Sequence, residues 1–296
     1  MPRLSVIIPV FNSAPYLALS VPALLRQEMP REEFELIFVD NNSTDGSAAL
    51  LRQREGITTL EEPKQSAYAA RNRGVEASRG DILVFTDPDC VPGRSWLRQI
   101  DGAFRDKAVQ VVLGPRRFAT DSLTLSTLAD YETAKDAYMA GCRRMDVVYG
   151  FANNMAVRRA AFEEFGPFDL LARGGDTLFL RRVVAQYGYD ALAFEETAAV
   201  RHMEIDSAAR YFSKVVTYAT SRKRNRGYNT AKPLSMRERF WAWQRAAAVN
   251  GYSPSRKAFS LALLGLGAAL WKLSFLGSIS AAGPASESSP EAAPYP

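Results

Sequence analysis

Two carboxylates separated by one residue stand at the end of an apolar run. Residues 82–86, Ile-Leu-Val-Phe-Thr, are followed by Asp87-Pro88-Asp89. In an extended strand, residues i and i+2 project to the same side, so both carboxylates can bind one hard cation such as Mg²⁺ or Mn²⁺. That cation could also hold a substrate phosphate. The alternative is turn chemistry, in which Pro88 fixes φ and the aspartates cap backbone amides.

Polar side chains also follow two other apolar runs. Asp40 ends the run 34–40, where it can accept hydrogen bonds from a ribose or a base N–H. It can equally join Asn41 and Asn42 in stabilising the turn that follows. Asn12 occupies the corresponding place after the first apolar run of the chain.

Four further charged or titratable residues are candidates for chemistry. Arg71 and Arg73, on the helix predicted before the carboxylates, can face a diphosphate, although exposed helical arginines are common. Asp176 follows two glycines at the start of a predicted helix, so it is either an N-cap or a general base. His202 is the only histidine and has either a structural role or a place in a metal site.

The order of elements explains why these groups should meet. Apolar runs alternate with helical patterns, and we expect strands at 4–9, 34–40, 58–60 and 82–86, with helices at 16–27, around 50–51 and at 66–77. This alternation predicts an α/β fold with a doubly wound, mostly parallel sheet. Such sheets bind ligands beyond the carboxyl ends of their strands, where Asn12, Asp40, Asp87 and Asp89 all lie.

The second half of the chain continues the pattern less regularly. We expect strands at 109–113 and 197–202, helices at 95–104, 121–140, 174–188 and 207–224, and a strand, turn, strand and short helix within 147–169. In the helix 121–140 we expect the acids Asp130, Glu132 and Asp136 to face solvent. Asn153 and Asn154 are candidates for contacts with a bound substrate, with turn roles as the alternative.

Composition and charge narrow the class of protein. The 296 residues are 47% hydrophobic and 23% charged, which suits one large α/β domain with an appendage. The two cysteines are far apart, so the chain has neither a disulfide framework nor a zinc spacing. Twelve lysines and arginines and a single acid lie in 209–257, whereas the net charge of the whole chain is +5. An acidic body with a basic C-terminal segment indicates attraction to an anionic surface.

The end of the chain changes character. Residues 258–282 form an apolar segment long enough to span a bilayer, and Arg256 and Lys257 just before it favour a cytoplasmic N-terminal side. Trp271 and Lys272 would lie deep in a straight span, so an interfacial helix or a helical hairpin is also open. The polar, proline-containing residues 283–296 are expected to be disordered.

Five blocks in order resemble the family-two inverting glycosyltransferases of GT-A fold. They are SVIIPVFN, ELIFVDNNSTDGS, SAYAARNRGVEASRGDILVFTDPDCVPGRSWL, NNMAVRRAAFEEFGPFD and GGDTLFLRRVV, between about Leu4 and His202. The resemblance implies a catalytic domain over 1–205. It also implies sugar transfer from a nucleoside-diphosphate sugar, such as a UDP- or GDP-sugar, to a hydroxyl acceptor, which we expect to be a glycan or a lipid-linked saccharide, with a small molecule as the alternative. Charge and hydropathy then predict a basic helical segment at 206–257, followed by the apolar segment. From the basic and apolar segments we expect the protein at the cytoplasmic face of the inner membrane.

The resemblance also assigns roles to residues. Asp176 would be the acceptor-activating base, and the Mn²⁺ or Mg²⁺ ligands would be Asp89 and Asp87, with His202 near the metal. Asp87 would also lie near the ribose, and the other donor-binding residues would be Pro9, Phe11, Asn12, Asp40 and Arg71. Many relatives have Glu-Asp where this chain has Gly175-Asp176, which leaves the acceptor-side contacts open.

Three other functions fit the residues less well. Nucleotidyl transfer usually needs a glycine-rich, basic loop after the first strand, and the loop NSAPYLALS has neither feature. A receiver-like module would leave the C-terminal half unexplained. Nucleic-acid binding through the basic cluster 221–227 would lack interleaved aromatic side chains, so we expect no nucleic-acid partner. An anionic membrane surface explains the basic segment better.

Overall fold

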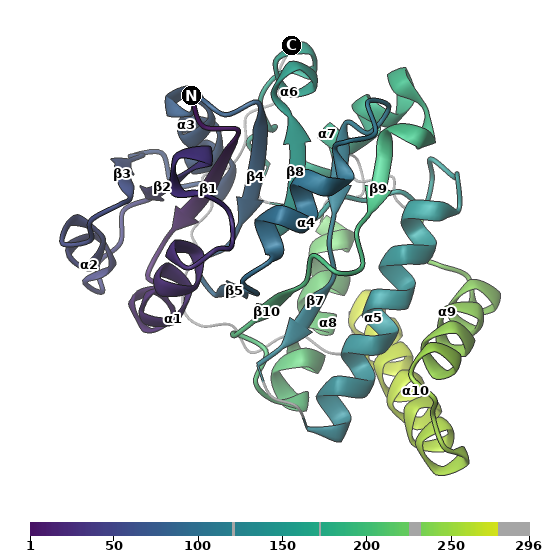
Figure 1. Cartoon of the computed structure of the whole chain (residues 1–296). Coiled ribbons are helices and arrows are strands. Elements are labelled where there is room, and N and C mark those ends of the chain that lie inside the picture. The colour runs from purple at the N-terminus through teal and green to yellow at the C-terminus, as the bar shows by residue number, and fades with distance from the viewer. Residues whose placement is uncertain (120–121, 172, 225–231, 278–296) are drawn as a thin grey trace.

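A seven-stranded sheet forms the centre of the molecule (Figure 1). The computed structural model describes residues 1–119, 122–171, 173–224 and 232–277, with the side chains of 221–224 left out. The strand order is β3-β2-β1-β4-β8-β6-β9. β1 pairs in parallel with β2 and β4, while β8 runs antiparallel to β4 and β6. The expected mostly parallel, doubly wound sheet is confirmed.

The first half of the sheet follows the apolar runs closely. Its elements are β1 (Leu4–Val10), α1 (Ala14–Leu25), β2 (Phe34–Asp40), α2 (Ser47–Arg52), β3 (Thr58–Glu61), α3 (Ala67–Ala77) and β4 (Ile82–Thr86). Strand residues alternate between two cores: Val6 and Ile8 pack with α1, whereas Ile7 packs on the face covered by α3. Because both faces are covered, these strands read as continuous apolar runs.

The second half adds short strands and a second sheet. Its elements are β5 (Cys90–Pro92), α4 (Trp96–Ala103), β6 (Val111–Leu113), β7 (Arg116–Phe118), α5 (Leu123–Gly141), β8 (Asn154–Arg158), α6 (Arg159–Phe165), α7 (Gly175–Tyr187), β9 (Leu192–Phe194) and β10 (Val200–His202), with 3₁₀ turns at Arg31–Glu33 and Tyr189–Ala191. Strands β5, β10 and β7 form the small sheet, in which β10 pairs antiparallel with β5 and parallel with β7.

Three helices follow the sheet domain. They are α8 (Ala208–Arg224), α9 (Met236–Val249) and α10 (Pro254–Leu276). α9 packs on α5, and α10 packs along α8 and touches α5. Within the described residues, α10 is the one helix long and apolar enough to cross a membrane.

The expectation that the acids of α5 face solvent is wrong. Asp136 is 1% exposed and pairs with Arg116 of β7, and Asp130 is 9% exposed. Glu132 is largely covered and accepts a hydrogen bond from the Tyr211 hydroxyl. The C-terminal helices and the small sheet cover both sides of α5, so its charged residues lie inside the molecule with partners.

Two other expectations also need correction. The strand expected near 147–151 is a turn and loop. The apolar segment is one continuous helix through Leu276, so a hairpin within 258–276 is excluded. Residues 278–282 and the predicted tail, 283–296, lie outside the described residues, as do the side chains of the basic cluster 221–227.

Candidate active site

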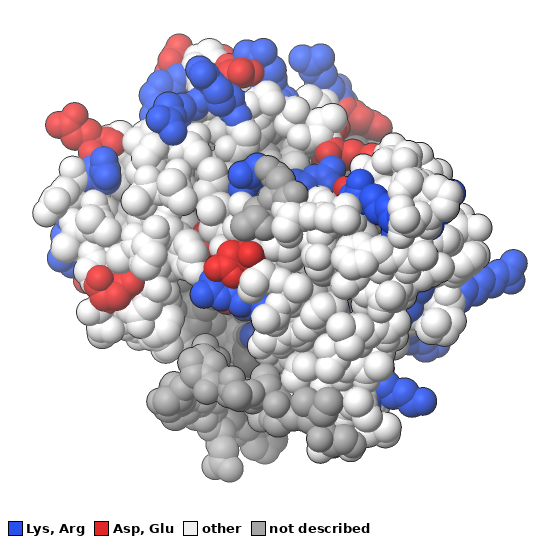
Figure 2. All heavy atoms as spheres, turned by 90° about the horizontal axis from the view of Figure 1, so that it is seen from below, with Lys and Arg blue, Asp and Glu red and all other residues white. Residues whose placement is uncertain are grey.

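The candidate residues gather where β1, β2 and β4 end. Figure 2 views the molecule from this side, where charged side chains lie mainly around the rim and a small mixed group lies near the centre. Asp40 is the last residue of β2, Asn12 follows β1 by two residues, and Asp87 follows β4 directly. The expected edge therefore carries the expected groups.

Asp40 is a buried carboxylate with spare hydrogen-bonding capacity. It is 7% exposed, and its Oδ2 accepts a long hydrogen bond from the Ser43 amide at 3.4 Å. Its Oδ1 is buried and has no hydrogen-bond partner among the described residues. An unpaired buried acceptor is costly, and a ligand hydroxyl or N–H would satisfy it.

Asn12 holds the loop beside Asp40 in place. Its φ of 46° lies in the left-handed region, which asparagine tolerates better than most residues. Its Oδ1 accepts from the Thr44 backbone amide at 2.8 Å, and the backbone amide of Asn12 donates to Ser43 Oγ at 3.1 Å. Phe11 next to it is 46% exposed at the open edge, whereas Pro9 is buried within β1 in register with Val39.

Asp87 and Asp89 lie in a turn and have separate partners. β4 ends at Thr86, and the Cys90 amide donates to the Asp87 carbonyl at 3.0 Å, which closes a turn before β5. Residues 87–89 are therefore a turn and not the extended strand from which a same-side projection was expected. Asp87 Oδ1 pairs with the Arg71 guanidinium at 2.5 Å, and Asp89 Oδ2 lies 3.1 Å from His202 Nε2. Asp87 and Asp89 thus lie in a turn and also have charged or titratable partners, so the turn and the ligand-site interpretations are compatible.

Asp89, Cys90 and His202 form a cluster that could hold a metal ion. Their ligand atoms lie within 4.8 Å of one another, because β10 pairs with β5 and places His202 opposite Cys90. Burial opposes ionisation of Asp89, but the hydrogen bond and charge of His202 outweigh it, so the pKa of Asp89 lies below its usual value. Burial and the Asp89 charge raise the pKa of the Cys90 thiol, which makes it a poor ligand. The carboxylate and imidazole fit Mn²⁺ or Mg²⁺ better than a soft metal.

Arg71 and Arg73 lie on different sides of α3. Arg71 is 6% exposed, and its guanidinium stacks on the Tyr68 ring with 5.4 Å to the ring centre. Its Nε is buried without a hydrogen-bond partner among the described residues. Arg73 is exposed and pairs with Glu76 at 3.3 Å, so the expectation that it faces the same ligand as Arg71 is wrong. Residues two apart on a helix do not share a face.

Asp176 is held from three directions in the first turn of α7. Its Oδ2 accepts from the Ala152 amide at 2.9 Å, and its Oδ1 accepts from the Tyr68 hydroxyl at 3.0 Å and the Thr177 amide at 2.8 Å. The N-cap is Gly174, which adopts a left-handed φ of 94°, so Asp176 does not cap the helix itself. The carboxylate is half-buried and fixed in orientation, as a general base requires.

The glycine before Asp176 has a steric reason. A Cβ at Gly175 would lie 2.6 Å from the Asp169 carbonyl oxygen and 3.2 Å from the Tyr68 ring. A glutamate therefore cannot stand at this position without movement of the backbone. The space that its side chain would need is partly taken by Tyr68.

Tyr68 is the site residue that the sequence analysis missed. Its hydroxyl donates to Asp176 and accepts from the Gly174 amide at 3.1 Å. Burial and the Asp176 charge raise the pKa of Tyr68, so the hydroxyl stays protonated and remains a donor. Tyr68 and Arg71 are three residues apart on α3, and Arg71 interacts with the charges of both Asp87 and Asp176. One helical turn thus joins the two halves of the site.

The two asparagines have different surroundings. Asn154 is buried, accepts from Trp96 Nε1 at 3.0 Å and donates to the Ala198 carbonyl at 2.8 Å, so it has a structural role. Asn153 Oδ1 is buried without a hydrogen-bond partner among the described residues. Asn153 therefore remains a candidate contact on the Asp176 side of the site.

Similarity to known proteins agrees with this geometry. AglE of Haloferax volcanii, named a glycosyltransferase, is 32% identical over 194 residues, which are 62% of this chain and 61% of AglE. Poly(ribitol-phosphate) beta-glucosyltransferase of Bacillus spizizenii is 30% identical over 38% of this chain and 19% of its own length. The chain thus spans less than two thirds of these relatives.

Solved structures share the fold. The mannosyltransferase PcManGT of Pyrobaculum calidifontis, in complex with GDP-Man and Mn²⁺, has a TM-score of 0.56 at 20% identity and covers 93% of this chain and 83% of its own. TarS of S. aureus has a TM-score of 0.53 at 17% identity, and the match covers 84% of this chain and 42% of TarS. The model of glycosyl transferase family 2 matches residues 5–166, more than half of the sequence. The chain therefore belongs to glycosyl transferase family 2 and has a GT-A fold.

Proposed function

We propose that this protein transfers a sugar from a nucleoside-diphosphate sugar to a hydroxyl acceptor, with inversion at the anomeric carbon. The observation that carries the proposal is the position of Tyr68 and Arg71 on one turn of α3. This turn brings the held carboxylate of Asp176 next to the Arg71–Asp87 pair. A proton acceptor and a cationic group for a phosphate thus face one another across a single site.

The donor would occupy the edge formed by β1, β2 and β4. Asp40 Oδ1 would accept from the nucleoside, and Phe11 and Asn12 would line the same side of the pocket, with Pro9 supporting it from within β1. Arg71 and Asp87 would lie towards the ribose and diphosphate. PcManGT with GDP-Man and TarS with UDP-GlcNAc are relatives in fold that bind donors of this class, which supports a UDP- or GDP-sugar here.

A divalent cation would be held by Asp89 and His202, with Asp87 nearby. When bound, Mn²⁺ or Mg²⁺ would neutralise charge on the departing diphosphate. The donor set fits because Asp89 offers a carboxylate oxygen and His202 a ring nitrogen 3.1 Å apart, and a bound cation would take the place of the proton between them. The Mn²⁺ in PcManGT supports the same class of metal.

The transfer itself needs little more than position and a base. As the acceptor oxygen forms a bond to the anomeric carbon, the bond from that carbon to the diphosphate oxygen breaks and the diphosphate takes the electron pair. Asp176 takes the acceptor proton, with Tyr68 and the Ala152 amide holding the carboxylate in line. Attack from the face opposite the diphosphate inverts the anomeric carbon.

The acceptor would enter from the Asp176 side. Asn153, whose Oδ1 has no hydrogen-bond partner within the described part of the chain, follows Ala152, whose amide donates to Asp176. A glycan or a lipid-linked saccharide is the acceptor class that we propose. The apolar helix α10 supports association with a membrane, and we propose the cytoplasmic face of the inner membrane as its location.

The test is a donor screen followed by one substitution. Nucleoside diphosphates are tested with Mn²⁺ by thermal shift, and sugars of the winning nucleotide are then tested for transfer. Asp176→Asn is expected to lower transfer about 10²- to 10⁴-fold, because the base is lost, while donor affinity changes little. Asp190→Asn, at an exposed ion pair with Arg143, is the matched control. Normal turnover by Asp176→Asn would remove Asp176 from the mechanism.

A further inference from the structure

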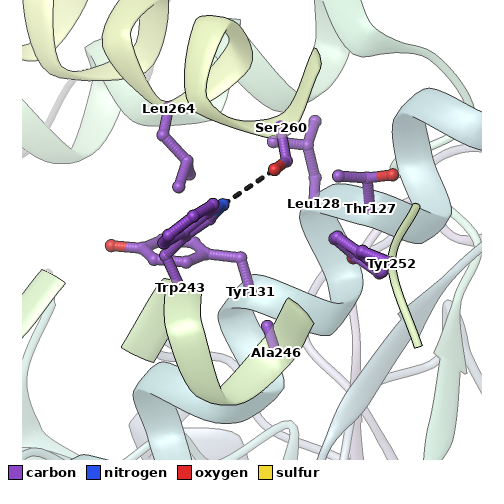
Figure 3. A pocket seen from close by; sticks show the side chains of 8 residues that line it. All are labelled: Thr127, Leu128, Tyr131, Trp243, Ala246, Tyr252, Ser260 and Leu264. Carbon is purple, nitrogen blue, oxygen red and sulfur yellow. Dashed lines mark hydrogen bonds between the residues drawn. The ribbon is translucent and has the colours of Figure 1, made fainter. Parts of the chain in front are cut away.

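Helix α10 has two faces of different character. One face packs on the protein: Leu263 joins the cluster around Phe212 of α8, Leu264 joins the cluster around Trp243 of α9, and Ser260 and Ser274 are buried. Figure 3 shows the contact between α5, α9 and α10, where Trp243 Nε1 donates to Ser260 Oγ at 2.8 Å. This small space is lined by side chains of all three helices.

An ion pair and a ring contact fix the start of the same helix. The Arg256 guanidinium lies 3.1 Å from Asp130 of α5 and stacks on the Tyr252 ring at 4.0 Å. The Tyr252 hydroxyl donates to the same Asp130 carboxylate at 2.8 Å. The inner face of α10 is therefore fully engaged with the folded domain.

The outer face of α10 is apolar and open. Leu261, Leu266, Leu273 and Leu276 are 41% to 64% exposed, and small residues lie between them at helical spacing. Only 11% of the most apolar stretch of the helix is buried. A helix on the surface of a domain usually presents polar residues to water. The apolar outer face of α10 therefore indicates that something other than water covers it.

The charge of this part of the chain indicates what covers the outer face of α10. No acidic residue follows Glu238 until Glu287, whereas five basic residues lie in the same interval: Arg239, Arg245, Arg256, Lys257 and Lys272. Lys257 and Lys272 are exposed on α10 itself. Glu238 is already used, since it forms the capping box of α9 with Ser235 and pairs with Arg144. The acids that α10 approaches, such as Asp130, are paired on its inner face. An apolar outer face that carries exposed lysines, in a stretch of sequence without acids, fits anionic lipid.

We propose that α10 lies flat in the interface of an anionic bilayer, with its leucine face in the lipid and its inner face still packed on α5, α8 and α9. The proposal states how the protein contacts the membrane that the proposed function assigns to it, and in this respect it rests on the proposed function. It does not depend on the donor, the metal or the base. It decides between the two membrane arrangements that the sequence left open.

A transmembrane arrangement of α10 conflicts with the packing. The helix has 23 residues, about 35 Å, so its length alone would allow a span. However, α8 packs along α10 and carries Arg210 and Lys214, which pair with Asp206 and Glu204. A span would either carry these charges into hydrocarbon or strip α10 from Asp130 and Trp243. Lying flat keeps every one of these contacts.

The test uses the full chain and vesicles of defined composition. Sedimentation is compared between vesicles of phosphatidylglycerol with phosphatidylcholine and vesicles of phosphatidylcholine alone, without donor or metal. We expect binding to the anionic vesicles, weaker binding at high salt, and release by alkaline carbonate, which leaves spanning proteins in the bilayer. Leu266→Glu and Leu273→Glu are each expected to weaken binding at least about tenfold, because a charge replaces an inserted leucine.

The controls separate this proposal from the proposed function. Leu50→Glu changes an equally exposed leucine on α2 and should bind vesicles as the wild type does. Transfer to a soluble acceptor should survive in all three variants, because none of them changes a proposed donor, metal or base residue. A wild-type chain that binds anionic vesicles but transfers no sugar would count only against the proposed function. Three results would overturn the flat arrangement: equal binding to both vesicle types, resistance to carbonate, or a dimer by light scattering that Leu266→Glu dissociates. The dimer would mean that a second copy covers the face.

Discussion

Asp87 and Asp89 are two residues apart, but their neighbours give them different chemistry. Arg71 pairs with Asp87 at 2.5 Å, so this carboxylate is partly neutralised before any ligand binds. Asp89 faces an imidazole and keeps a low pKa, since the His202 hydrogen bond outweighs the cost of burial. Asp87, whose charge is balanced by Arg71, suits a hydrogen bond to a substrate hydroxyl or a metal ion shared with other ligands. Asp89, which keeps its charge, suits direct binding of a cation.

Asp89→Ala is expected to abolish metal-dependent donor binding. Without its charged ligand, the site retains the His202 imidazole and Asp87, whose charge Arg71 already compensates. Calorimetry of nucleoside diphosphate binding with and without Mn²⁺ measures the effect. Cys90→Ala is the control from the same cluster, and it should keep the metal dependence because a protonated thiol is a poor ligand. Metal dependence that is unchanged in Asp89→Ala would count against this metal site.

Tyr68→Phe is expected to lower kcat about tenfold while the affinity for donor stays within about twofold. The hydroxyl is one of three donors to Asp176, and a hydrogen bond to a charged group contributes about 1.5–3 kcal/mol. The ring itself, which stacks on Arg71 and packs on Phe168, remains in the variant. Steady-state kinetics with donor titration separates the two parameters. A change in KM for donor without a change in kcat would place Tyr68 in donor binding.

At the scale of elements, long apolar runs could be predicted and short strands could not. β1, β2 and β4 lie between covered faces, so their sequences are apolar throughout and their ends are marked by polar residues. β7 and β9 have three residues each, too few to show a period. The buried acids of α5 were misplaced because the side chains that cover them come from β7 and from helices far away in sequence.

The candidate site shows the same limit. Asp40, Asp87 and Asp176 were found because acids at strand ends and helix starts are conspicuous in an apolar context. Tyr68 was missed because a tyrosine on a helix usually packs in a core, and its partner lies 108 residues away. No local pattern predicts a hydrogen bond over that distance. The turn at Asp87 was open to both interpretations, because a turn and a ligand site use the same residue types.

Glu35 connects three strands at the edge opposite the site. Its carboxylate accepts from Ser5 Oγ at 2.7 Å and from the amide of Arg79 at 2.6 Å, just before β4. Ser5 Oγ in turn accepts from the Gly80 amide at 2.8 Å. Burial opposes ionisation, but these hydrogen bonds and the Arg79 charge outweigh it and hold the pKa of Glu35 below its usual value.

Glu35→Gln is therefore expected to lower the free energy of unfolding by about 1–3 kcal/mol at neutral pH. Because the pKa is lowered in the folded state, the stabilisation is present above the ordinary glutamate value and is lost as pH falls through the folded pKa. Urea unfolding at a series of pH values should show the two proteins converging in acid. Glu61→Gln, at an exposed pair with Arg52, should differ little from wild type throughout. If the difference in unfolding free energy between Glu35→Gln and wild type did not change with pH, the charge of Glu35 would not be the cause.

At the scale of the whole molecule, the C-terminal helices are part of the folded unit through α5. Asp136 of α5 pairs with Arg116 of β7, and β7 pairs with β10, which carries His202. Asp130, less than two turns earlier on the same helix, contacts Arg117 of β7 on one oxygen and Arg256 on the other. The helix therefore links the strand that supports the candidate metal site to the helix that we place on the membrane.

Asp130→Asn is expected to loosen α10 without unfolding the sheet domain. The substitution leaves the half-buried Arg256 and the exposed Arg117 without their charge partner, so the cost is below the roughly 3–5 kcal/mol of breaking a fully buried pair. Hydrogen exchange should therefore rise in α10 and little in β1, β2 and β4. Asp136→Asn is the control, since it removes another buried carboxylate of α5 whose partners, Arg116 and Tyr149, lie outside the C-terminal helices. Faster exchange of α10 in the control but not in Asp130→Asn would show that the helix is held elsewhere. Faster exchange in Asp130→Asn alone would locate its attachment at the ion pair with Arg256, the contact that a flat helix keeps and a spanning helix would lose.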